Sequence, residues 1–277
     1  MGEIIAHDMK ISLIISTYNS PKYLALALNS VLMQTRMPDE VIVADDGSGE
    51  ETRMLIAKFQ KQFKVPLIHV WQPDEGFRVC RIRNKAINTA AGDYIIQIDG
   101  DIIMHPHFIE DHEKNAKPGY FAAGCRTFLS EEYSKVILES GEIDIPMILH
   151  NCMDTSNARR IPILTPFFKY RRLHNKTTIR GCNMAYWKKD ALSVNGYNED
   201  FEGWGSEDCD FSIRLSNSGL KKLWLKFTAI AIHIYHTENS RDSEISNRKL
   251  MNETMEKGLT YVPNGIKKAS GQKDEQI

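Results

Sequence analysis

The sequence lacks several features that define particular classes of protein. Its five cysteines include no CxxC pair, and their odd number argues against a disulfide framework and for reduced thiols in a cytoplasmic protein. No apolar run approaches the roughly 20 residues that a bilayer-crossing helix needs, and residues 1–10 lack the apolar core of a signal peptide. We therefore expect a cytoplasmic protein, with peripheral contact at the inner face of a membrane as an alternative.

An excess of one charge and the glycine motifs for phosphates are absent as well. Lys+Arg 35 against Asp+Glu 36 gives a formal net charge of -1, so no global field attracts nucleic acid, and we expect no nucleic-acid partner. Neither GxGxxG nor GxxxxGK[ST] occurs, which excludes the dinucleotide fingerprint and the P-loop. An anionic ligand would have to be bound by a local site of another kind.

What the first 100 residues do contain is a repeated alternation of strand and helix patterns. Short runs of branched apolar residues predict buried strands at 11–16, 40–44, 67–71 and 94–98. Helical spacing of apolar residues follows the first three runs, at 22–34, 52–63 and 79–91. This order predicts an α/β fold with a mostly parallel sheet flanked by helices, in which ligands bind beyond the carboxyl ends of the strands.

Polar side chains follow three of these strands at that edge. They are Thr17 and Asn19 after the first strand, Asp45 and Asp46 after the second, and Asp99 and Asp101 after the fourth. Two carboxylates at the end of a buried strand cost free energy unless a cation, hydrogen bonds or solvent compensate them. For the DDGSG stretch at 45–49, ordinary turn chemistry is an open alternative, because Asp, Gly and Ser favour turns for local reasons.

The middle of the chain shows no sustained periodicity, and residues 130–176 are expected to form an irregular lid. Its last part combines aromatic and basic side chains that could hold a phosphate or touch a membrane surface. A solvated loop with one hydrophobic anchor is the alternative. The residues are Phe167, Phe168, Tyr170, Arg171, Arg172, His174 and Lys176.

Order returns in the last third, around the stretch GWGSEDCDF at 203–211. Gly203 and Gly205 permit unusual backbone angles beside Trp204. Three carboxylates precede a helical pattern at 211–217, where the helix dipole favours negative charge. We assign Asp210 to capping and keep Glu207 and Asp208 for a site. Residues 230–236 alternate like a strand and carry His233 and His236.

Taken in order, these motifs resemble those of family 2 glycosyltransferases of the GT-A fold. The later half resembles the C-terminal module of β-1,4-galactosyltransferases and bacterial chondroitin polymerases, and the likeness runs from about residue 10 to residue 248. The matching pieces are STYN (16–19), VADDGS (43–48), RNKA (83–86), IDGD (98–101), GWGSEDCDF (203–211) and YHTENSRD (235–242). One departure is Ile82, which stands where the family usually has a small residue before the RN pair.

The resemblance implies a UDP-sugar donor and a divalent metal, Mn²⁺ or Mg²⁺. Asp101 would contact the metal together with His236, with Asp99 and His233 as further possible ligands and Asp99 otherwise on the ribose side of the donor. Asp45, with Asp46, Thr17 and Asn19, would hold the base. Arg83 would lie near the diphosphate, with Arg78 and Arg81 as further candidates for that charge. For both histidines, a place in the core of a strand is the alternative.

On the acceptor side, the resemblance implies that Asp208 is the catalytic base. Glu207 would bind a sugar hydroxyl, and Trp204 with Gly205 would offer a flat surface to a sugar ring. For Trp204 the alternative is a half-buried core residue.

The same likeness divides the chain into four parts. We expect a nucleotide-sugar-binding half at 1–125, an irregular lid at 126–177, an acceptor-side and catalytic portion at 178–250, and a polar tail at 251–277. The implied function is inverting, metal-dependent transfer of a hexose or N-acetylhexosamine from a UDP-sugar to a glycan or lipid-linked acceptor, in surface polysaccharide biosynthesis. A non-catalytic sugar-nucleotide or glycan-binding protein is the alternative. A nucleotidyltransferase fits less well, because TYNSPKY at 17–23 replaces the Gly-rich basic loop.

Overall fold

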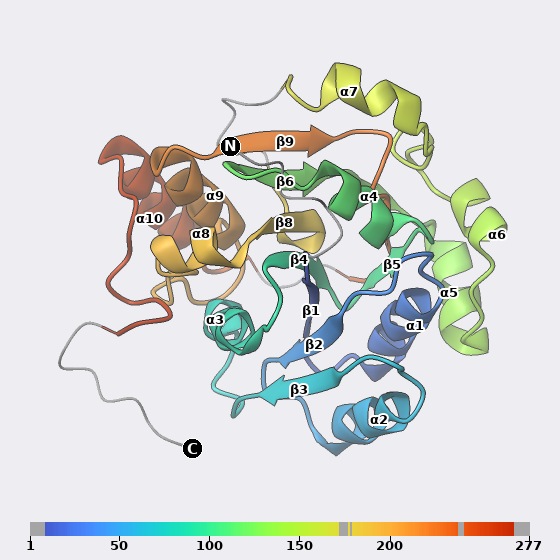
Figure 1. The fold of residues 1–277 in the computed structure, drawn as a ribbon. Coiled ribbons are helices and arrows are strands. Elements are labelled where there is room, and N and C mark those ends of the chain that lie inside the picture. The colour runs from blue at the N-terminus through green and yellow to red at the C-terminus, as the bar shows by residue number, and fades with distance from the viewer. Residues whose placement is uncertain (1–8, 172–176, 178, 238–240, 269–277) are drawn as a thin grey trace.

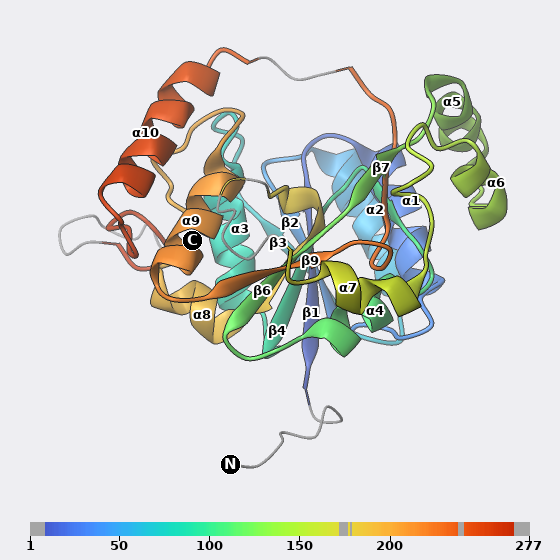
Figure 2. The same cartoon turned by 90° about the horizontal axis from the view of Figure 1, so that it is seen from above.

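Seven strands form one central sheet in the order β3-β2-β1-β4-β8-β6-β9 (Figures 1 and 2). The computed structural model describes residues 9–171, 177, 179–237 and 241–268. The strands of this sheet are β1 Ile11–Thr17, β2 Glu40–Asp45, β3 Leu67–Trp71, β4 Tyr94–Asp99, β6 Tyr120–Gly124, β8 Met184–Trp187 and β9 Lys221–Leu225.

The four predicted strands form the parallel half of this sheet. β1 lies between β2 and β4 and is parallel to both, and β3 is parallel to β2. β8 is antiparallel to β4 and to β6, so the sheet changes direction at its middle. In the register of the sheet, Thr17 lies opposite Asp45 and Ser16 lies opposite Asp99. The polar ends of β1, β2 and β4 therefore lie side by side at one edge of the sheet.

Helices cover both faces of the sheet, because neighbouring residues of each buried strand point to opposite sides. Leu13 packs on the side of α1, α2 and α4, whereas Ile14 packs on the side of α3, α8 and α9 (Figure 1). The helices are α1 Pro21–Leu32, α2 Glu50–Gln60, α3 Val79–Thr89, α4 Phe108–Asn115, α8 Lys188–Ser193, α9 Glu207–Asn217 and α10 Glu244–Glu256. α10 packs against α9.

A second sheet of three strands stands beside the first. Its order is β5-β10-β7, with bounds β5 Ile102–Met104, β10 Ala231–His233 and β7 Arg126–Phe128. The strand expected at 230–236 is therefore shorter than predicted, and His236 follows it in a loop. Pairing ends at His233 because β5 and β7 offer only three residues each to β10.

The segment expected to be an irregular lid contains regular structure, so that expectation is wrong in part. α5 Glu131–Ser140 and α6 Ile145–His150 cover the small sheet through Ile137 and Ile148. Ser130 and Asp144 accept hydrogen bonds from the first turns of these helices. Two short turns of 3-10 helix and one short helix complete the list: η1 Pro162–Leu164, α7 Thr165–Phe168 and η2 Gly181–Asn183.

None of the helices within the described ranges is both long enough and apolar enough to cross a membrane.

Candidate active site

The expected donor residues converge at the carboxyl ends of β1, β2 and β4. Asp45 is fully buried; its Oδ1 accepts a hydrogen bond from the Ser48 N–H at 2.8 Å, and its Oδ2 lies 2.8 Å from His69 Nε2. Asn19 has a positive φ of 42° and accepts a hydrogen bond from the Gly49 N–H at 3.0 Å. The DDGSG loop is thus held by local turn bonds and also by a histidine from the next strand.

Asp46 fastens this loop to the segment before α3. It accepts hydrogen bonds from Gln72 Nε2 at 2.6 Å and from the backbone N–H of Arg78 at 2.8 Å. Burial raises the pKa of Asp46. The side chain of Arg78 pairs with Glu202 at 2.7 Å. The other candidate for the diphosphate in this region, Arg81, pairs with Glu75 at 2.8 Å.

Arg83 is the centre of a buried acidic cluster. Its guanidinium is 3% exposed and lies 3.0 Å from Asp99, 2.9 Å from Asp208 and 3.3 Å from Glu207. These contacts join α3, β4 and the first turn of α9, so residues 124 and 125 positions apart meet at one cation. Arg83, which is predicted to lie near the diphosphate, contacts three carboxylates.

One guanidinium does not supply enough positive charge for three carboxylates. Burial and the neighbouring Asp208 raise the pKa of Glu207 to about 7, against the opposing effect of Arg83. Burial also raises the pKa of Asp99 to about 6. Such raised values are typical of sites whose charge is completed by a ligand or a proton.

Asp208 is held on three sides. Besides Arg83, its carboxylate accepts a hydrogen bond from the backbone N–H of Gly181 at 2.7 Å and faces the hydroxyl of Tyr197 at 3.4 Å. A Cβ atom on residue 181 would lie 2.3 Å from Asp208 Oδ1, so only glycine lets the backbone approach the carboxylate this closely. Gly181 and Tyr197 were missed in the sequence, where only the unusual RGCN at 180–183 could have pointed to the glycine.

The assignment of Asp210 to capping is wrong. α9 begins at Glu207, four residues earlier than predicted, and its N-cap residue is Ser206 with a φ of 72°. Asp210 therefore lies inside the helix, fully buried, where it pairs with Arg214 at 2.8 Å and accepts a hydrogen bond from Thr254 at 2.7 Å. It links α9 to α10 and lies outside the acidic cluster.

A group with the composition of a metal site lies at the end of the small sheet. Asp101 precedes β5, His233 ends β10 and His236 follows three residues later; one ligand atom of each lies within 4.8 Å of the others. Asp101 Oδ2 is 3.0 Å from His236 Nε2 and 3.4 Å from His233 Nε2. Asp99 points to Arg83 and is not part of this group, which we call the metal triad.

The metal triad passes a chemical test of fitness for a divalent cation. Asp101 Oδ1 is buried with no hydrogen-bond partner among the described residues, as is expected of an unfilled ligand position. His236 Nδ1 lies 2.8 Å from the carbonyl of Thr237, which fixes the N–H on that nitrogen and leaves Nε2 as a ligand atom. Burial lowers the pKa of His233 to about 4, so this ring is neutral and able to bind a metal.

Trp204 belongs to the loop that precedes α9. Asn247 of α10 donates a hydrogen bond to its carbonyl at 3.4 Å, so this loop lies against α10. Its side chain is 39% exposed, and the guanidinium of Arg241 lies 5.4 Å from its ring centre. Gly203 and Gly205 flank it with φ values of 71° and 112°. A core position is therefore excluded for Trp204, and its ring is available at the surface.

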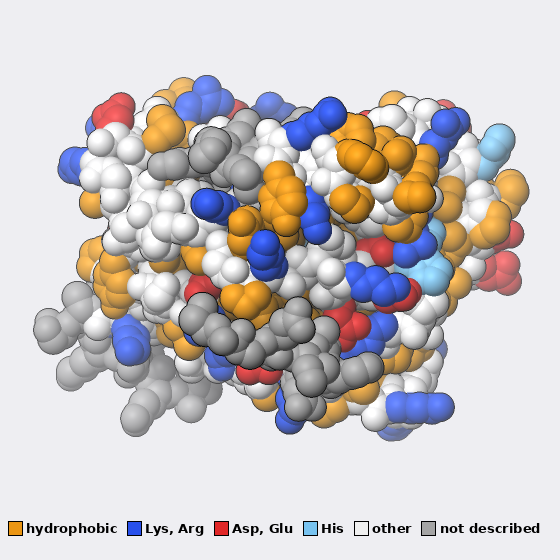
Figure 3. All heavy atoms as spheres, turned by 45° about the horizontal axis from the view of Figure 1, so that its top comes forward, with side chains coloured by type: hydrophobic (Ala, Val, Ile, Leu, Met, Phe, Trp, Pro, Cys, Tyr) orange, Lys and Arg blue, Asp and Glu red, His pale blue; other side chains and the backbone are white. Residues whose placement is uncertain are grey.

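The aromatic and basic residues around α7 form part of one surface. Phe167 and Tyr170 are exposed, and the guanidinium of Arg171 stacks 4.3 Å above Phe168. Hydrophobic side chains gather where α7 lies, with lysine and arginine beside them (Figure 3). The remaining predicted members, Arg172, His174 and Lys176, lie outside the described residues. Residues 238–240 of the YHTENSRD motif lie outside them as well.

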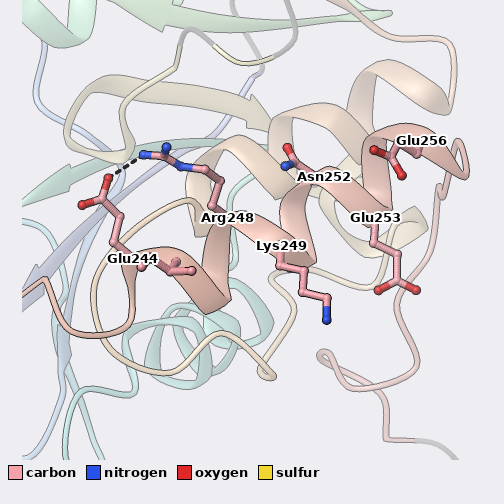
Figure 4. Close-up of a pocket in the computed structure, with 7 residues that line it drawn as sticks. Glu244, Arg248, Lys249, Asn252, Glu253 and Glu256 are labelled. Atoms are coloured by element: carbon pink, nitrogen blue, oxygen red, sulfur yellow. Dashed lines mark hydrogen bonds and ion pairs between the residues drawn. The ribbon is translucent and has the colours of Figure 1, made fainter.

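A shallow hollow on α10 is separate from these groups. All of its lining residues come from that one helix, and Glu244 and Arg248 pair across it (Figure 4). It contains none of the predicted site residues.

A model described as glycosyl transferase family 2 matches residues 12–193, and one described as the N-terminal domain of galactosyltransferase matches residues 164–237. Chondroitin synthases of Escherichia coli and Pasteurella multocida (strain Pm70) are 26% and 27% identical to this chain, over 76% of its length. The chain spans only 32% and 23% of those two relatives.

Two solved structures resemble the fold. TarS of S. aureus has a TM-score of 0.62 at 18% identity, over 89% of this chain and 39% of TarS. The mannosyltransferase PcManGT from Pyrobaculum calidifontis, in complex with GDP-Man and Mn²⁺, has a TM-score of 0.60 at 14% identity, over 83% of this chain and 58% of that one. At such identities the likeness concerns the fold alone, and it confirms the expected GT-A fold.

Proposed function

Since the chain belongs to glycosyl transferase family 2, we propose that it is an inverting, metal-dependent glycosyltransferase that uses a UDP-sugar. The observation that carries the proposal is that two groups of side chains meet at the end of β4. They are the metal triad, whose Asp101 follows β4, and the acidic cluster around Arg83, whose Asp99 ends β4. Asp99 and Asp101, one residue apart, belong to one group each. A donor bound across this strand end would reach both a metal and a base.

The nucleotide is proposed to lie over the ends of β1 and β2. Thr17 and Asp45 stand at the same level there, and Thr17 Oγ1 is buried without a hydrogen-bond partner among the residues described. An unpaired buried hydroxyl is costly unless a ligand completes it. TarS has been solved in complex with UDP, which supports uracil as the first base to test. Guanine is the natural control, because PcManGT binds GDP-Man.

Asp101, His233 and His236 would hold the metal ion. Two imidazole ligands favour Mn²⁺ over Mg²⁺, which prefers an all-oxygen shell. A bound divalent ion would neutralise charge that develops on the leaving diphosphate. Asp101 supplies the one carboxylate of this set, and His236 keeps its orientation through the Thr237 carbonyl.

Asp208 is the proposed base. Its hydrogen bonds from the Gly181 N–H and from Arg83 hold the carboxylate in place, where it would accept the proton of an acceptor hydroxyl. The oxygen of that hydroxyl would form a bond to the anomeric carbon while the bond from this carbon to the diphosphate oxygen breaks, with inversion. Glu207 and Trp204 are proposed to bind the acceptor, through a hydroxyl and through a ring face.

The donor class is tested by calorimetric titration of the protein with UDP, with and without Mn²⁺, and with GDP as the control nucleotide. The proposal expects binding of UDP that requires Mn²⁺ and is much weaker for GDP. If neither nucleotide binds in the presence of Mn²⁺, the proposed donor site is wrong.

The base is tested by Asp208→Asn, with exposed Asp200→Asn as a matched control. We expect UDP release from the preferred UDP-sugar in the presence of acceptor to fall by about 10² or more, with UDP affinity nearly unchanged. Asp200→Asn should leave both unchanged. Activity of Asp208→Asn within about tenfold of the parent would refute the assignment. Persistent nucleotide binding with no turnover in the parent protein would favour the non-catalytic alternative.

A further inference from the structure

Arg126 is a cation beside the metal triad that has no role in the site described above. It lies on β7, two residues before Phe128, and therefore on the same face of the small sheet. Phe128 pairs in register with His233 of β10, and their ring centres are 5.3 Å apart. The guanidinium of Arg126 stacks on the ring of Phe128, with its carbon 4.5 Å from the ring centre.

Arg126 makes no direct ion pair within the part of the chain that the structure describes. No Asp or Glu of the described ranges lies within ion-pair distance of it, and its Nε is buried without a hydrogen-bond partner there. Its Nη1 contacts only the sulfur of Cys182, 3.7 Å away, which is a weak acceptor. Arg36, Arg83 and Arg214, other arginines with low exposure, all pair with carboxylates. A half-buried guanidinium without such a partner is costly unless an anion completes it.

The position of Arg126 identifies which anion that is. Through Phe128, whose ring contacts that of His233, the guanidinium is placed beside the metal triad, and its charge acts on Asp101, His233 and His236. The same charge repels a metal cation held by these three residues, because like charges repel in a partly desolvated site. The charges of Asp101 and Arg126 offset each other, so these side chains together are close to neutral. A divalent ion alone would therefore create an excess of positive charge.

We propose that Arg126 is a second cation for the diphosphate of the donor, and that it makes binding of metal and diphosphate mutually dependent. The inference rests on the proposed function, whose donor supplies the diphosphate. Several negative charges on the diphosphate would balance both the ion and the guanidinium. Each ligand then strengthens binding of the other by the same factor, as linkage requires. Phe128 is the positioning residue that holds the guanidinium over the centre.

The test compares the parent protein with Arg126→Gln and Arg126→Lys. Arg36→Gln is the matched control, because Arg36 is also a partly buried arginine but pairs with Asp39 just before β2, at the edge of the sheet opposite the donor residues. Mn²⁺ binding without nucleotide is measured by electron paramagnetic resonance. Binding of UDP and of UMP is then measured calorimetrically with saturating Mn²⁺. UMP lacks the second phosphate and so separates the diphosphate from the base.

For Arg126→Gln we expect Mn²⁺ alone to bind about threefold tighter or more, because a repelling charge is gone. UDP should bind about tenfold more weakly and UMP should change by less than about threefold. Arg126→Lys keeps the charge and should match the parent in Mn²⁺ binding, which separates charge from any loss of structure. Arg36→Gln should match the parent throughout.

Unchanged or weaker Mn²⁺ binding by Arg126→Gln would overturn the inference, and so would equal losses for UDP and UMP. Absence of Mn²⁺-dependent UDP binding in the parent protein is a different result, since it refutes the proposed function before any variant is considered. The Mn²⁺ measurement without nucleotide does not depend on the donor and reports on the charge of Arg126 in either case.

Discussion

Acidification should destabilise this fold through one buried histidine, His112 of α4. The side chain is fully buried, and its Nε2 lies 3.0 Å from Oδ1 of Asn183. Asn183 donates through Nδ2 to the carbonyls of Cys125 and Ala229, so its Oδ1 must be an acceptor. His112 therefore carries its proton on Nε2. Its Nδ1 is buried with no hydrogen-bond partner in the described part of the chain.

A second proton on Nδ1 would place a charge where nothing solvates it, and burial lowers the pKa of His112 to about 4. In the unfolded chain the group titrates near the ordinary value of about 6.5. Between these values the unfolded state binds more protons, so the free energy of unfolding decreases as the pH falls below 6.5. Linkage gives a loss of about 2 kcal/mol between pH 7.5 and pH 5.0 from this one group.

The perturbation is His112→Gln, which retains an N–H donor for Asn183 but does not titrate. Urea unfolding of both proteins at pH 7.5 and pH 5.0 gives four free energies. The parent should lose about 2 kcal/mol more than the variant over this range, since other groups titrate equally in both. Exposed His150→Gln serves as the control and should behave as the parent. An equal loss in the parent and in His112→Gln would refute the reasoning.

Two further predictions concern contacts of the acidic cluster and of α9. Gly181→Ala should reduce the rate of sugar transfer by about 10² while preserving UDP affinity, because a Cβ atom 2.3 Å from Asp208 Oδ1 would displace the proposed base. Steady-state kinetics and UDP calorimetry measure the two quantities. Unchanged turnover would contradict the prediction. Asp210→Ala should lower the free energy of unfolding by about 3 to 5 kcal/mol, because it leaves buried Arg214 without its carboxylate. Urea unfolding measures this, with Glu50→Ala as the control, which removes an exposed pair with Arg53 and should leave the free energy of unfolding nearly unchanged.

The parallel half of the fold was predictable because its information is local. The runs at 11–16 and 94–98 are buried on both faces and consist almost wholly of apolar residues, so no other element type fits them. Their ends carry the polar residues that mark the ligand edge. The sequence order alone then places Thr17, Asp45 and Asp99 near one another.

The rest depends on contacts that sequence patterns do not encode. Arg83 meets Asp208 across 125 positions, and its role among three carboxylates arises only when α9 packs beside α3. Gly181 is significant only because a carboxylate from another element lies against its backbone. Arg126 stands out because no carboxylate in the described ranges pairs with it, which is a property of its surroundings and not of its own residue type. The helix α5 was missed because it is short and mostly polar, and α6 because its six residues are too few to show a helical period.

The order of strands in the small sheet has a consequence for folding during synthesis. β10 occupies the middle position between β5 and β7, although more than 100 residues separate it from β7 in the chain. While the polypeptide is still emerging from the ribosome, β1 to β4 can pair with one another, but β5 and β7 have no strand between them until Ala231–His233 appears. The small sheet is therefore completed by the insertion of one late strand, and the same insertion delivers His233 and His236 to Asp101. A nascent chain stopped before residue 231 would hold the sugar-nucleotide half of the fold with an unfinished small sheet and no metal centre.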